Sequence, residues 1–231
     1  MTILQRHTLC WLETSALNSI AEQVDSSFSH LPAAMRREAR DYLLSGALPG
    51  IVRRGPRNGD DIPLGFCFPM RWHRLRLRMA TSAPTGAITS YSTPEQTARL
   101  PVTDSTCATR AFNTLRQAWR WPELRFGVWG SVALEIMTPW QWTDSDSDLD
   151  IHFAPTSFSQ LALCQETLNR IEQKFQLRID GEIALPNGYA INIKEWFSGS
   201  STLLAKGEND VQLISRQHVT ELSETSLYEI Y

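Results

Sequence analysis

The sequence predicts an α+β protein with a mixed α/β second half, in which a small N-terminal α+β domain precedes a domain built on a mixed sheet. Three observations lead to this prediction. The chain has 231 residues, which is enough for one large domain or two modest ones. Residues 81–106 are rich in Ser, Thr, Pro and Ala, as linkers are. Beyond them, helix-like and strand-like patterns alternate. We therefore expect an arginine-rich domain at 1–80 and a second domain at 107–231.

The N-terminal half contains three recognisable elements. Residues 31–44 have the apolar spacing of an amphipathic helix that begins near a proline and ends near a glycine. Turn signals with Gly and Pro within 49–66 predict a short hairpin. Basic and apolar residues alternate towards the end of 71–78, which predicts a strand with one basic face.

The second half has a clearer rhythm. Helices are expected at 107–120, 132–137 and 156–175, and strands at 124–129, 149–153, 177–185, 189–196 and 211–214. The Pro-Asn-Gly turn at 186–188 predicts that the two strands around it form a hairpin. Strands and helices that alternate in this order are typical of a mixed sheet with helices packed against it.

The charge is unevenly distributed along the chain. The net charge of -3 divides into +4 for residues 1–101, which contain no Lys, and -7 for residues 102–231. Arginine forms bidentate contacts with phosphate. The basic half therefore suits a polyanionic ligand or an acidic partner protein, and the alternative interpretation is a solvated arginine-rich face.

Composition also bounds the compartment and the class of protein. No run approaches the roughly 18 apolar residues that a membrane helix needs, and no signal peptide is expected, so we predict no association with a membrane. The four cysteines are widely scattered and form no CxxC pair. This pattern argues against a disulfide framework or a structural zinc site and favours a reducing, cytoplasmic location.

Two carboxylates in the segment Ser147 to Ile151 point to a metal site. On a strand, residues two apart face the same side, so Asp148 and Asp150 would share one side. Their mutual repulsion is relieved by a divalent cation, and magnesium prefers carboxylate and phosphate oxygens. A bare Asp-x-Asp also occurs on exposed strands and in calcium loops. An EF-hand calcium loop is disfavoured. Whichever of the two preceding aspartates the loop is counted from, it has no Gly at the sixth position and no Glu at the twelfth.

The pair Gly130-Ser131 lies between a predicted strand and a predicted helix. Backbone N–H groups and the helix dipole favour anions at such a junction, and Gly lets a phosphate approach closely. An ordinary tight turn is the alternative interpretation for this pair alone. A phosphate cradle on one strand-helix junction, followed by two carboxylates on the next strand, is what metal-assisted nucleotidyl transfer requires.

These residues resemble the signature of the DNA polymerase β-like nucleotidyltransferase superfamily, in which Gly-Ser opens a helix and Asp-x-Asp follows on a strand. The resemblance implies a third carboxylate on a neighbouring strand, for which Asp180 and then Glu182 are the candidates. Sixteen residues separate Ser131 from Asp148, more than the usual pattern, and the Trp-containing loop 139–147 accounts for the excess.

A closer resemblance, over most of the chain, is to the malonate decarboxylase holo-acyl-carrier-protein synthases, also called phosphoribosyl-dephospho-CoA transferases. It rests on short motifs in both halves. They are Leu9-Cys10-Trp11-Leu12, Pro49-Gly50-Ile51-Val52-Arg53-Arg54, Ile62-Pro63-Leu64-Gly65, Gly127-Val128-Trp129-Gly130-Ser131, Ser147-Asp148-Leu149-Asp150, Asp180-Gly181-Glu182 and Lys194-Glu195-Trp196. The N-terminal motifs are less specific than the metal motif.

The resemblance implies a definite reaction. The donor would be 2'-(5''-triphosphoribosyl)-3'-dephospho-CoA, the acceptor a serine of the acyl-carrier subunit of malonate decarboxylase, and the leaving group pyrophosphate. Asp148, Asp150 and Asp180 would bind Mg²⁺ or Mn²⁺, and Asp180 or Glu182 would alternatively take the serine proton. Gly130 and Ser131 would hold the leaving pyrophosphate.

The basic residues have expected partners in this reaction. Arg53, Arg54 and Arg76 are expected to contact donor phosphates or the acidic carrier protein. Lys194 is a weaker candidate for substrate binding, because an ordinary surface position is the favoured interpretation of it.

Other functions share parts of this pattern. The chain could instead be a nucleotidyltransferase that uses an NTP and acts on a small molecule, an RNA or a protein hydroxyl. A different class is a non-catalytic module that binds nucleic acid or a carrier protein through the arginines. The acidic second half argues against nucleic acid as a partner. A scaffold subunit with an inert Asp-x-Asp is a further alternative.

Overall fold

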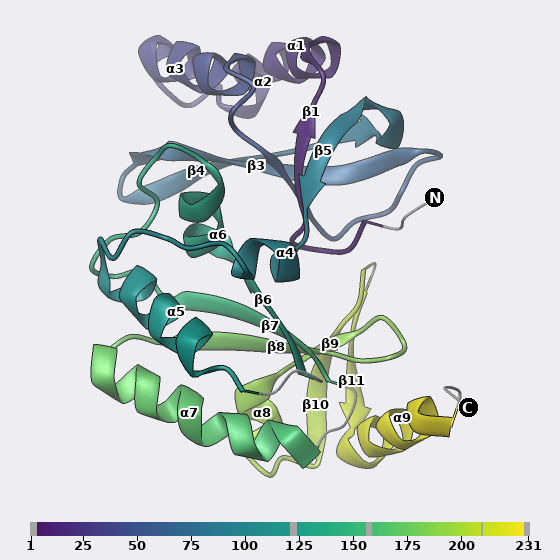
Figure 1. Cartoon of the computed structure of the whole chain (residues 1–231). Coiled ribbons are helices and arrows are strands. Elements are labelled where there is room, and N and C mark those ends of the chain that lie inside the picture. Colours follow the sequence, from purple (N-terminus) through teal and green to yellow (C-terminus); the bar gives the residue numbers. More distant parts are fainter. Residues whose placement is uncertain (1–3, 121–123, 156–158, 209, 229–231) are drawn as a thin grey trace. The chain divides into compact units, whose positions relative to one another are not determined.

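The computed structural model describes residues 4–120, 124–155, 159–208 and 210–228. The chain divides into two compact units (Figure 1). Unit 1 contains Met1–Thr93 and Thr138–Gln141, and unit 2 contains Pro94–Met137 and Trp142–Tyr231. The predicted α+β class is confirmed, because both units combine helices with a sheet. Within the described ranges, no helix is both long enough and apolar enough to cross a membrane.

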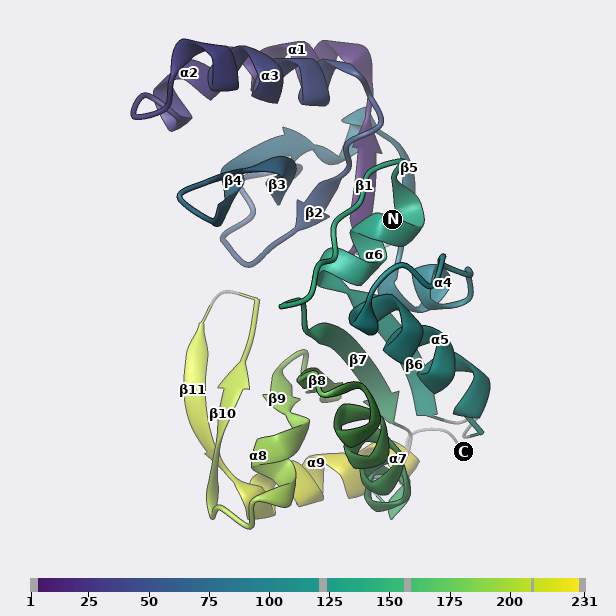
Figure 2. The same ribbon diagram turned by 90° about the vertical axis from the view of Figure 1, so that its left-hand side faces the viewer.

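Unit 1 is an antiparallel sheet accompanied by three short helices (Figures 1 and 2). Its elements are β1 (Leu9–Leu12), α1 (Thr14–Glu22), α2 (Val24–Ser27), α3 (Ala33–Leu44), β2 (Gly50–Val52), β3 (Asp61–Trp72), β4 (Leu75–Pro84), the 3-10 turn η1 (Thr85–Ala87) and β5 (Ile88–Ser92). The strands are ordered β4-β3-β2-β1-β5. The helix predicted at 31–44 is α3, and the predicted hairpin is the β2–β3 pair.

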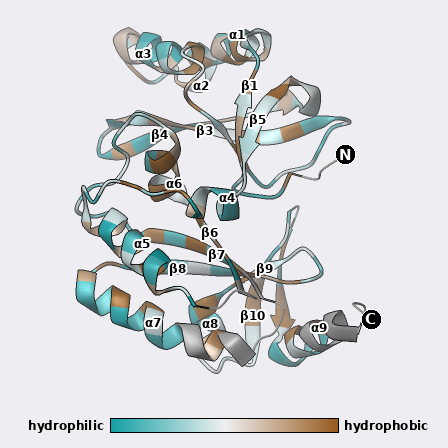
Figure 3. Cartoon of the chain, viewed as in Figure 1, coloured by the Kyte–Doolittle hydropathy of each residue, from teal (hydrophilic) through white to brown (hydrophobic). Residues whose placement is uncertain are grey.

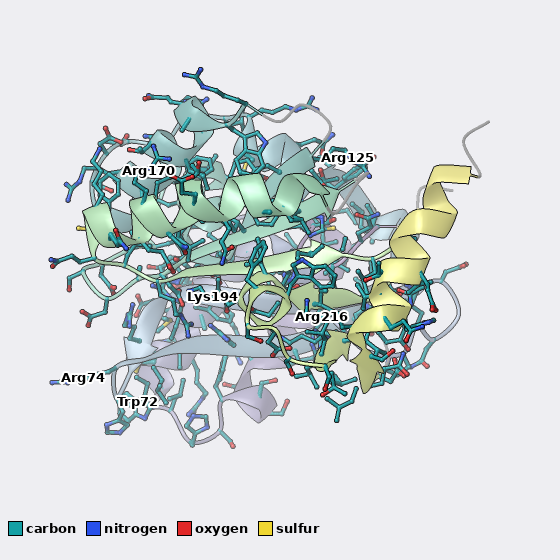
Figure 4. The ribbon with its side chains drawn as sticks, turned by 90° about the horizontal axis from the view of Figure 1, so that it is seen from below. Trp72, Arg74, Arg125, Arg170, Lys194 and Arg216 are labelled. Carbon is teal, nitrogen blue, oxygen red and sulfur yellow. The ribbon has the colours of Figure 1, made fainter. Side chains whose placement is uncertain are left out.

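The segment 71–78, predicted as one strand, contains the end of β3, a tight turn at His73 and Arg74, and the first residues of β4. Trp72 pairs with Leu75, and the two residues between them, His73 and Arg74, have φ values of 48° and 68°. Positive φ at both central residues is the geometry of the tight hairpin turn that matches strand twist. The sequence offers no Gly or Asn at these positions, so the turn signal was absent. Figure 4 labels Trp72 and Arg74 at this turn.

Residues 81–106, predicted as a linker, form regular structure over most of their length. β4 extends to Pro84, and β5 pairs with β1 inside the sheet of unit 1. The helix α4 (Pro94–Ala98) already belongs to unit 2. The chain thus passes from unit 1 to unit 2 between Thr93 and Pro94. Small polar residues were taken as a sign of a loop, but Thr and Ser also fit the exposed face of a strand.

Unit 2 contains a six-stranded mixed sheet in the order β11-β10-β9-β8-β7-β6 (Figure 2). Besides α4, its elements are α5 (Cys107–Ala118), β6 (Leu124–Trp129), α6 (Gly130–Met137), β7 (Leu149–Pro155), α7 (Ser159–Phe175), β8 (Ile179–Ala184), β9 (Ala190–Asn192), α8 (Ile193–Phe197), β10 (Thr202–Lys206), β11 (Val211–Ser215) and α9 (Arg216–Tyr228). The pair β7–β8 is parallel, and the other pairs are antiparallel.

Most predicted elements of unit 2 are present, with one exception. The strand expected at 189–196 ends at Asn192, and α8 follows it. The Asn192 side chain accepts a hydrogen bond of 2.8 Å from the backbone N–H of Lys194, which caps the helix. The first residues of the helix predicted at 156–175 lie outside the described residues.

The core of unit 2 lies on one face of this sheet. Leu149, Ile151 and Phe153 alternate along β7 and are fully buried. They share a hydrophobic cluster with Phe112 of α5 and Leu161 of α7. Figure 3 shows hydrophobic residues along the central strands of this unit. Because side chains alternate across a strand, the residues between these three point to the opposite face, where the polar site is built.

Candidate active site

The junction between β6 and α6 touches the carboxylate strand directly. Trp129 pairs with Asp150 across β6 and β7, so Gly130 begins α6 beside Asp150. Gly130 has φ of 69°, and a Cβ built on it would collide with the Asp150 carboxylate, lying 3.0 Å from its Cγ. Only glycine meets both demands without strain. The structure therefore brings the two predicted motifs, Gly130-Ser131 and Asp148-Leu149-Asp150, into contact.

Four carboxylates gather on the polar face of the sheet, and we call them the carboxylate cluster: Asp148, Asp150, Asp180 and Glu182. In the parallel β7–β8 pair, Asp150 is in register with Asp180. The side chains of Asp148 and Asp180 are 36% and 34% exposed, whereas that of Glu182 is only 7% exposed. This register puts Asp180 beside the Asp-x-Asp motif, on the neighbouring strand where the superfamily resemblance leads us to expect a third carboxylate.

Asp150 lies at the centre of the carboxylate cluster. Burial and then the nearby charges of Asp148, Asp180 and Glu182 together raise its pKa to about 7, against the lowering effect of Arg178. A carboxyl with this pKa binds a proton or a cation readily at neutral pH. The site therefore concentrates negative charge where a cation would relieve it.

Arg178, which was not among the predicted site residues, supplies positive charge to the cluster. Its Nη2 lies 2.7 Å from Oδ2 of Asp148 and 4.0 Å from Oδ2 of Asp180. Asn192, also not predicted, donates a hydrogen bond of 2.7 Å to Oδ1 of Asp180. Arg178 is two residues before Asp180, so the alternation of side chains along a strand could have placed it on the same face.

Glu182 has partners of a different kind. Its Oε1 lies 3.5 Å from Nζ of Lys206, and the backbone of β8 pairs it with His152. His152 Nε2 in turn lies 3.4 Å from Oε1 of Glu95 on α4. Because Glu182 is the more buried carboxylate and already has a lysine partner, Asp180 is the better placed third carboxylate.

The donor set suits a hard divalent cation in its chemistry, since it offers carboxylate oxygens on one face. Within the part of the chain that the structure describes, no three His, Cys, Asp or Glu side chains converge closely enough to form a complete ligand set. The guanidinium of Arg178 instead contacts Asp148 and lies near Asp180. The carboxylates therefore suit a divalent cation by their type and charge, although in the described residues three of them are not brought together as ligands.

The predicted substrate-binding residues are divided between the two units. Ser131 lies in the first turn of α6, beside the carboxylate cluster. Lys194, which Figure 4 labels, is the second residue of α8. Its Nζ lies 2.6 Å from Oε1 of Glu172, so it already has an anionic partner. Arg53, Arg54 and Arg76 all belong to unit 1.

The arginines of unit 1 differ in exposure. Arg53 is exposed, whereas Arg54 and Arg76 are half-buried. The backbone N–H of Arg53 donates to the carbonyl of Pro63 across the β2–β3 hairpin. Arg53 also lines a shallow hollow together with Gln23 and Thr81. Of the three, Arg53 is therefore the one most open to a ligand.

Comparison with known proteins finds two matching family profiles, one for each half of the chain. Residues 97–217 match the family profile described as "Phosphoribosyl-dephospho-CoA transferase MdcG C-terminal domain", and residues 5–94 match the corresponding N-terminal domain. No solved structure is detectably similar to the chain.

Curated relatives carry the same name, phosphoribosyl-dephospho-CoA transferase. The protein of Xanthomonas euvesicatoria is 25% identical over 91% of this chain and 94% of its own. Those of Bradyrhizobium diazoefficiens and Pseudomonas syringae are both 28% identical, over 80% and 81% of this chain and 86% of their own lengths. The chain therefore belongs to the phosphoribosyl-dephospho-CoA transferase family and is an enzyme.

Proposed function

We propose that the enzyme transfers the phosphoribosyl-dephospho-CoA group from 2'-(5''-triphosphoribosyl)-3'-dephospho-CoA to a serine of the acyl-carrier subunit of malonate decarboxylase, and that pyrophosphate leaves. The observation that supports this most is the contact between Gly130 and Asp150. It sets the start of a helix, where a phosphate would be held, against the carboxylates that would act on the same triphosphate. The family name supports the transferred group.

In this proposal the serine oxygen of the carrier attacks the α-phosphorus of the donor. A new phosphorus–oxygen bond forms, the bond from that phosphorus to the oxygen of the pyrophosphate breaks, and the product is a phosphodiester. Backbone N–H groups at Gly130 and Ser131 hold the departing phosphates. Asp180, oriented by Asn192, or alternatively Glu182, accepts the serine proton.

Asp148, Asp150 and Asp180 are the residues that would hold Mg²⁺ or Mn²⁺. When bound, such a cation would neutralise the developing charge of the triphosphate and help the pyrophosphate to leave. The raised pKa of Asp150 supports this assignment, because the carboxylate cluster lacks enough positive charge of its own. Arg178 would remain beside the cluster as a further phosphate partner.

The function is tested by the intact mass of the apo acyl-carrier subunit after incubation with enzyme, Mg²⁺ and the triphosphoribosyl donor. We expect a mass gain equal to the phosphoribosyl-dephospho-CoA group with the wild type and none with Asp148→Asn. Asp146→Asn, an exposed neighbour in the same loop, serves as the control and should retain the gain. If AMP from ATP appears on another acceptor instead, the fold and the site stand, but the proposed donor is refuted.

Reversing the charge of the exposed Arg53 and the half-buried Arg54 should weaken binding of an anionic substrate. In Arg53→Glu/Arg54→Glu we expect the KM for the carrier or for the donor to rise about tenfold, while kcat changes little, since charges at the rim of an interface act mainly on encounter. Steady-state kinetics at low and physiological salt measure both constants. Arg99→Glu is the control for a changed net charge. Unchanged KM values for both substrates would remove these arginines from the binding surface.

A further inference from the structure

Glu135 lies near the end of α6, one helical turn beyond the phosphate cradle, and its carboxylate is the centre of a hydrogen-bond network within unit 2. Its Oε2 accepts from the backbone N–H of Trp142 at 2.9 Å, and from the N–H and the hydroxyl of Thr143 at 2.6 and 2.7 Å. Its Oε1 accepts from the hydroxyl of Ser105 at 2.7 Å. We call these four residues the Glu135 clamp.

The clamp fixes a segment that is itself buried. Trp142 and Thr143 are only 1% and 2% exposed. A buried backbone N–H without a partner costs roughly 1–3 kcal/mol, so the two amides depend on the Glu135 carboxylate. Hydrogen bonds to a charged acceptor are stronger than those between neutral groups. The carboxylate remains charged: burial would raise its pKa, but the hydrogen bonds from Thr143, Ser105 and Trp142 outweigh this and lower the pKa.

The same segment is attached to the start of α5. Thr143 Oγ1 lies 2.8 Å from Oγ1 of Thr106, the residue that caps α5. Thr106 and Thr109 form a reciprocal capping box at this end of the helix. Thr143 is therefore held from two sides, by α6 through Glu135 and by α5 through Thr106.

The chain between the clamp and the first metal-site carboxylate is short and closed. Asp144 Oδ1 accepts from the hydroxyl of Ser147 and from the backbone N–H of Asp146, at 2.9 and 3.1 Å. The Ser147 hydroxyl accepts in turn from the N–H of Asp144 at 2.9 Å. Asp148 follows directly. Only a compact turn therefore separates the clamped residue Thr143 from the carboxylate cluster.

We propose that Glu135 is a positioning residue for the carboxylate cluster: by holding Trp142 and Thr143, it sets where the long α6–β7 loop delivers Asp148 and Asp150 relative to the cradle on the same helix. The inference rests on the proposed function, because it concerns the same metal site. It explains how a loop of unusual length still ends with the carboxylates beside Gly130. Glu135 itself touches neither substrate nor metal in this scheme.

The test compares Glu135→Ala with Glu166→Ala, which removes a carboxylate that is 85% exposed on α7 and serves as the matched control. Thr143→Val and Thr143→Ser form a second pair, since serine keeps the hydroxyl that meets Glu135 and valine does not. Mn²⁺ alone is the binding probe, followed by electron paramagnetic resonance. Transfer to the carrier is measured as kcat and KM, and the folded fraction by circular dichroism.

We expect Glu135→Ala to remain folded at 20 °C, to weaken Mn²⁺ binding and to lower kcat, each by about 10- to 100-fold, the range typical of residues that orient metal ligands. KM for the carrier should stay unchanged. Thr143→Val should show a smaller effect in the same direction, Thr143→Ser should restore wild-type values, and Glu166→Ala should show none. Wild-type Mn²⁺ affinity and kcat in folded Glu135→Ala would overturn the inference.

The two possible failures are separable. A wild-type chain that neither binds Mn²⁺ nor transfers the group would refute the proposed function. A wild type that does both, next to a Glu135→Ala variant that does both equally well, would refute only the positioning role. If Glu135→Ala fails to fold, Thr143→Val against Thr143→Ser decides the inference, because those variants leave the carboxylate and both backbone amides in place.

Discussion

Replacing Asp150 by asparagine is expected to abolish transfer and, in metal-free buffer above pH 7, to make the protein more stable. Transfer should fall by at least about 10³-fold, the scale on which removal of a central electrostatic group acts. The gain in stability follows from the raised pKa of Asp150. A buried carboxylate next to like charges is a cost that the folded state carries for its function.

The dependence on pH follows from the direction of the shift. The pKa of Asp150 is about 7 in the folded chain against 3.8 as the ordinary value. Between these values the folded state binds a proton that the unfolded state lacks, so the free energy of unfolding falls as pH rises and the loss is complete above about pH 7. The difference of about three between these two pKa values corresponds to at most about 4 kcal/mol in the free energy of unfolding. The stability difference between Asp150→Asn and wild type should therefore vanish near pH 4 and be largest at pH 8.

Urea unfolding at pH 4.5, 6 and 8 in the presence of a chelator measures this difference. Asp146→Asn, which lies in the exposed part of the neighbouring loop, is the control and should leave the profile unchanged. Adding Mg²⁺ should raise the stability of the wild type but not of Asp150→Asn. A variant that is less stable than wild type at pH 8 would show that the contacts of the carboxylate outweigh its repulsions.

Gly130→Ala should reduce activity nearly as much as Asp150→Asn does, for a steric reason. An alanine at φ of 69° costs about 1–2 kcal/mol by itself. Its Cβ would in addition displace the Asp150 carboxylate, because no space separates them. Loss of this alignment is expected to reduce kcat by about 10²-fold or more, since small misplacements of reacting groups are costly. Steady-state kinetics and urea unfolding measure the two effects.

Gly188→Ala separates the backbone effect from the collision. Gly188 also has a positive φ, of 83°, and nothing lies within 4 Å of a Cβ placed there. This variant should lose about 1 kcal/mol of stability and keep full activity. If Gly130→Ala behaves in the same way as Gly188→Ala, then the contact with Asp150 does not govern the site.

Much of the site was accessible from the sequence because its residues obey local rules. Period two places Asp148 and Asp150 on one side of their strand without any tertiary information, whereas Asp180 was chosen because the resemblance implies a third carboxylate on a neighbouring strand. The Gly-Ser pair alone could be an ordinary tight turn, and it indicated a site only together with the two carboxylates on the next predicted strand. The direct contact of Gly130 with Asp150 was not predictable, because it depends on the antiparallel β6–β7 register.

Residues that act through long-range pairing were beyond the reach of such rules. Glu135 resembles any polar residue on a short helix until the fold brings Trp142 and Ser105 to it. Asn192 looked like part of a strand because β-branched residues flank it, and only its cap to Lys194 reveals that a helix begins there. The role of each depends on the partners that the chain presents, not on its own neighbours in sequence.

The segment Thr138–Gln141 belongs to unit 1 although its neighbours on both sides belong to unit 2. Trp140 packs edge-to-face on Tyr42 of α3, with ring centroids 5.2 Å apart. During synthesis, unit 1 therefore cannot be completed until residues 138–141 have been made, well after residue 93. A fragment that ends at residue 93 would lack this segment of unit 1. The complementary fragment would carry Trp140 without the Tyr42 ring on which it packs. Chimaeras between relatives would need to exchange two separate stretches of sequence to transfer one unit intact.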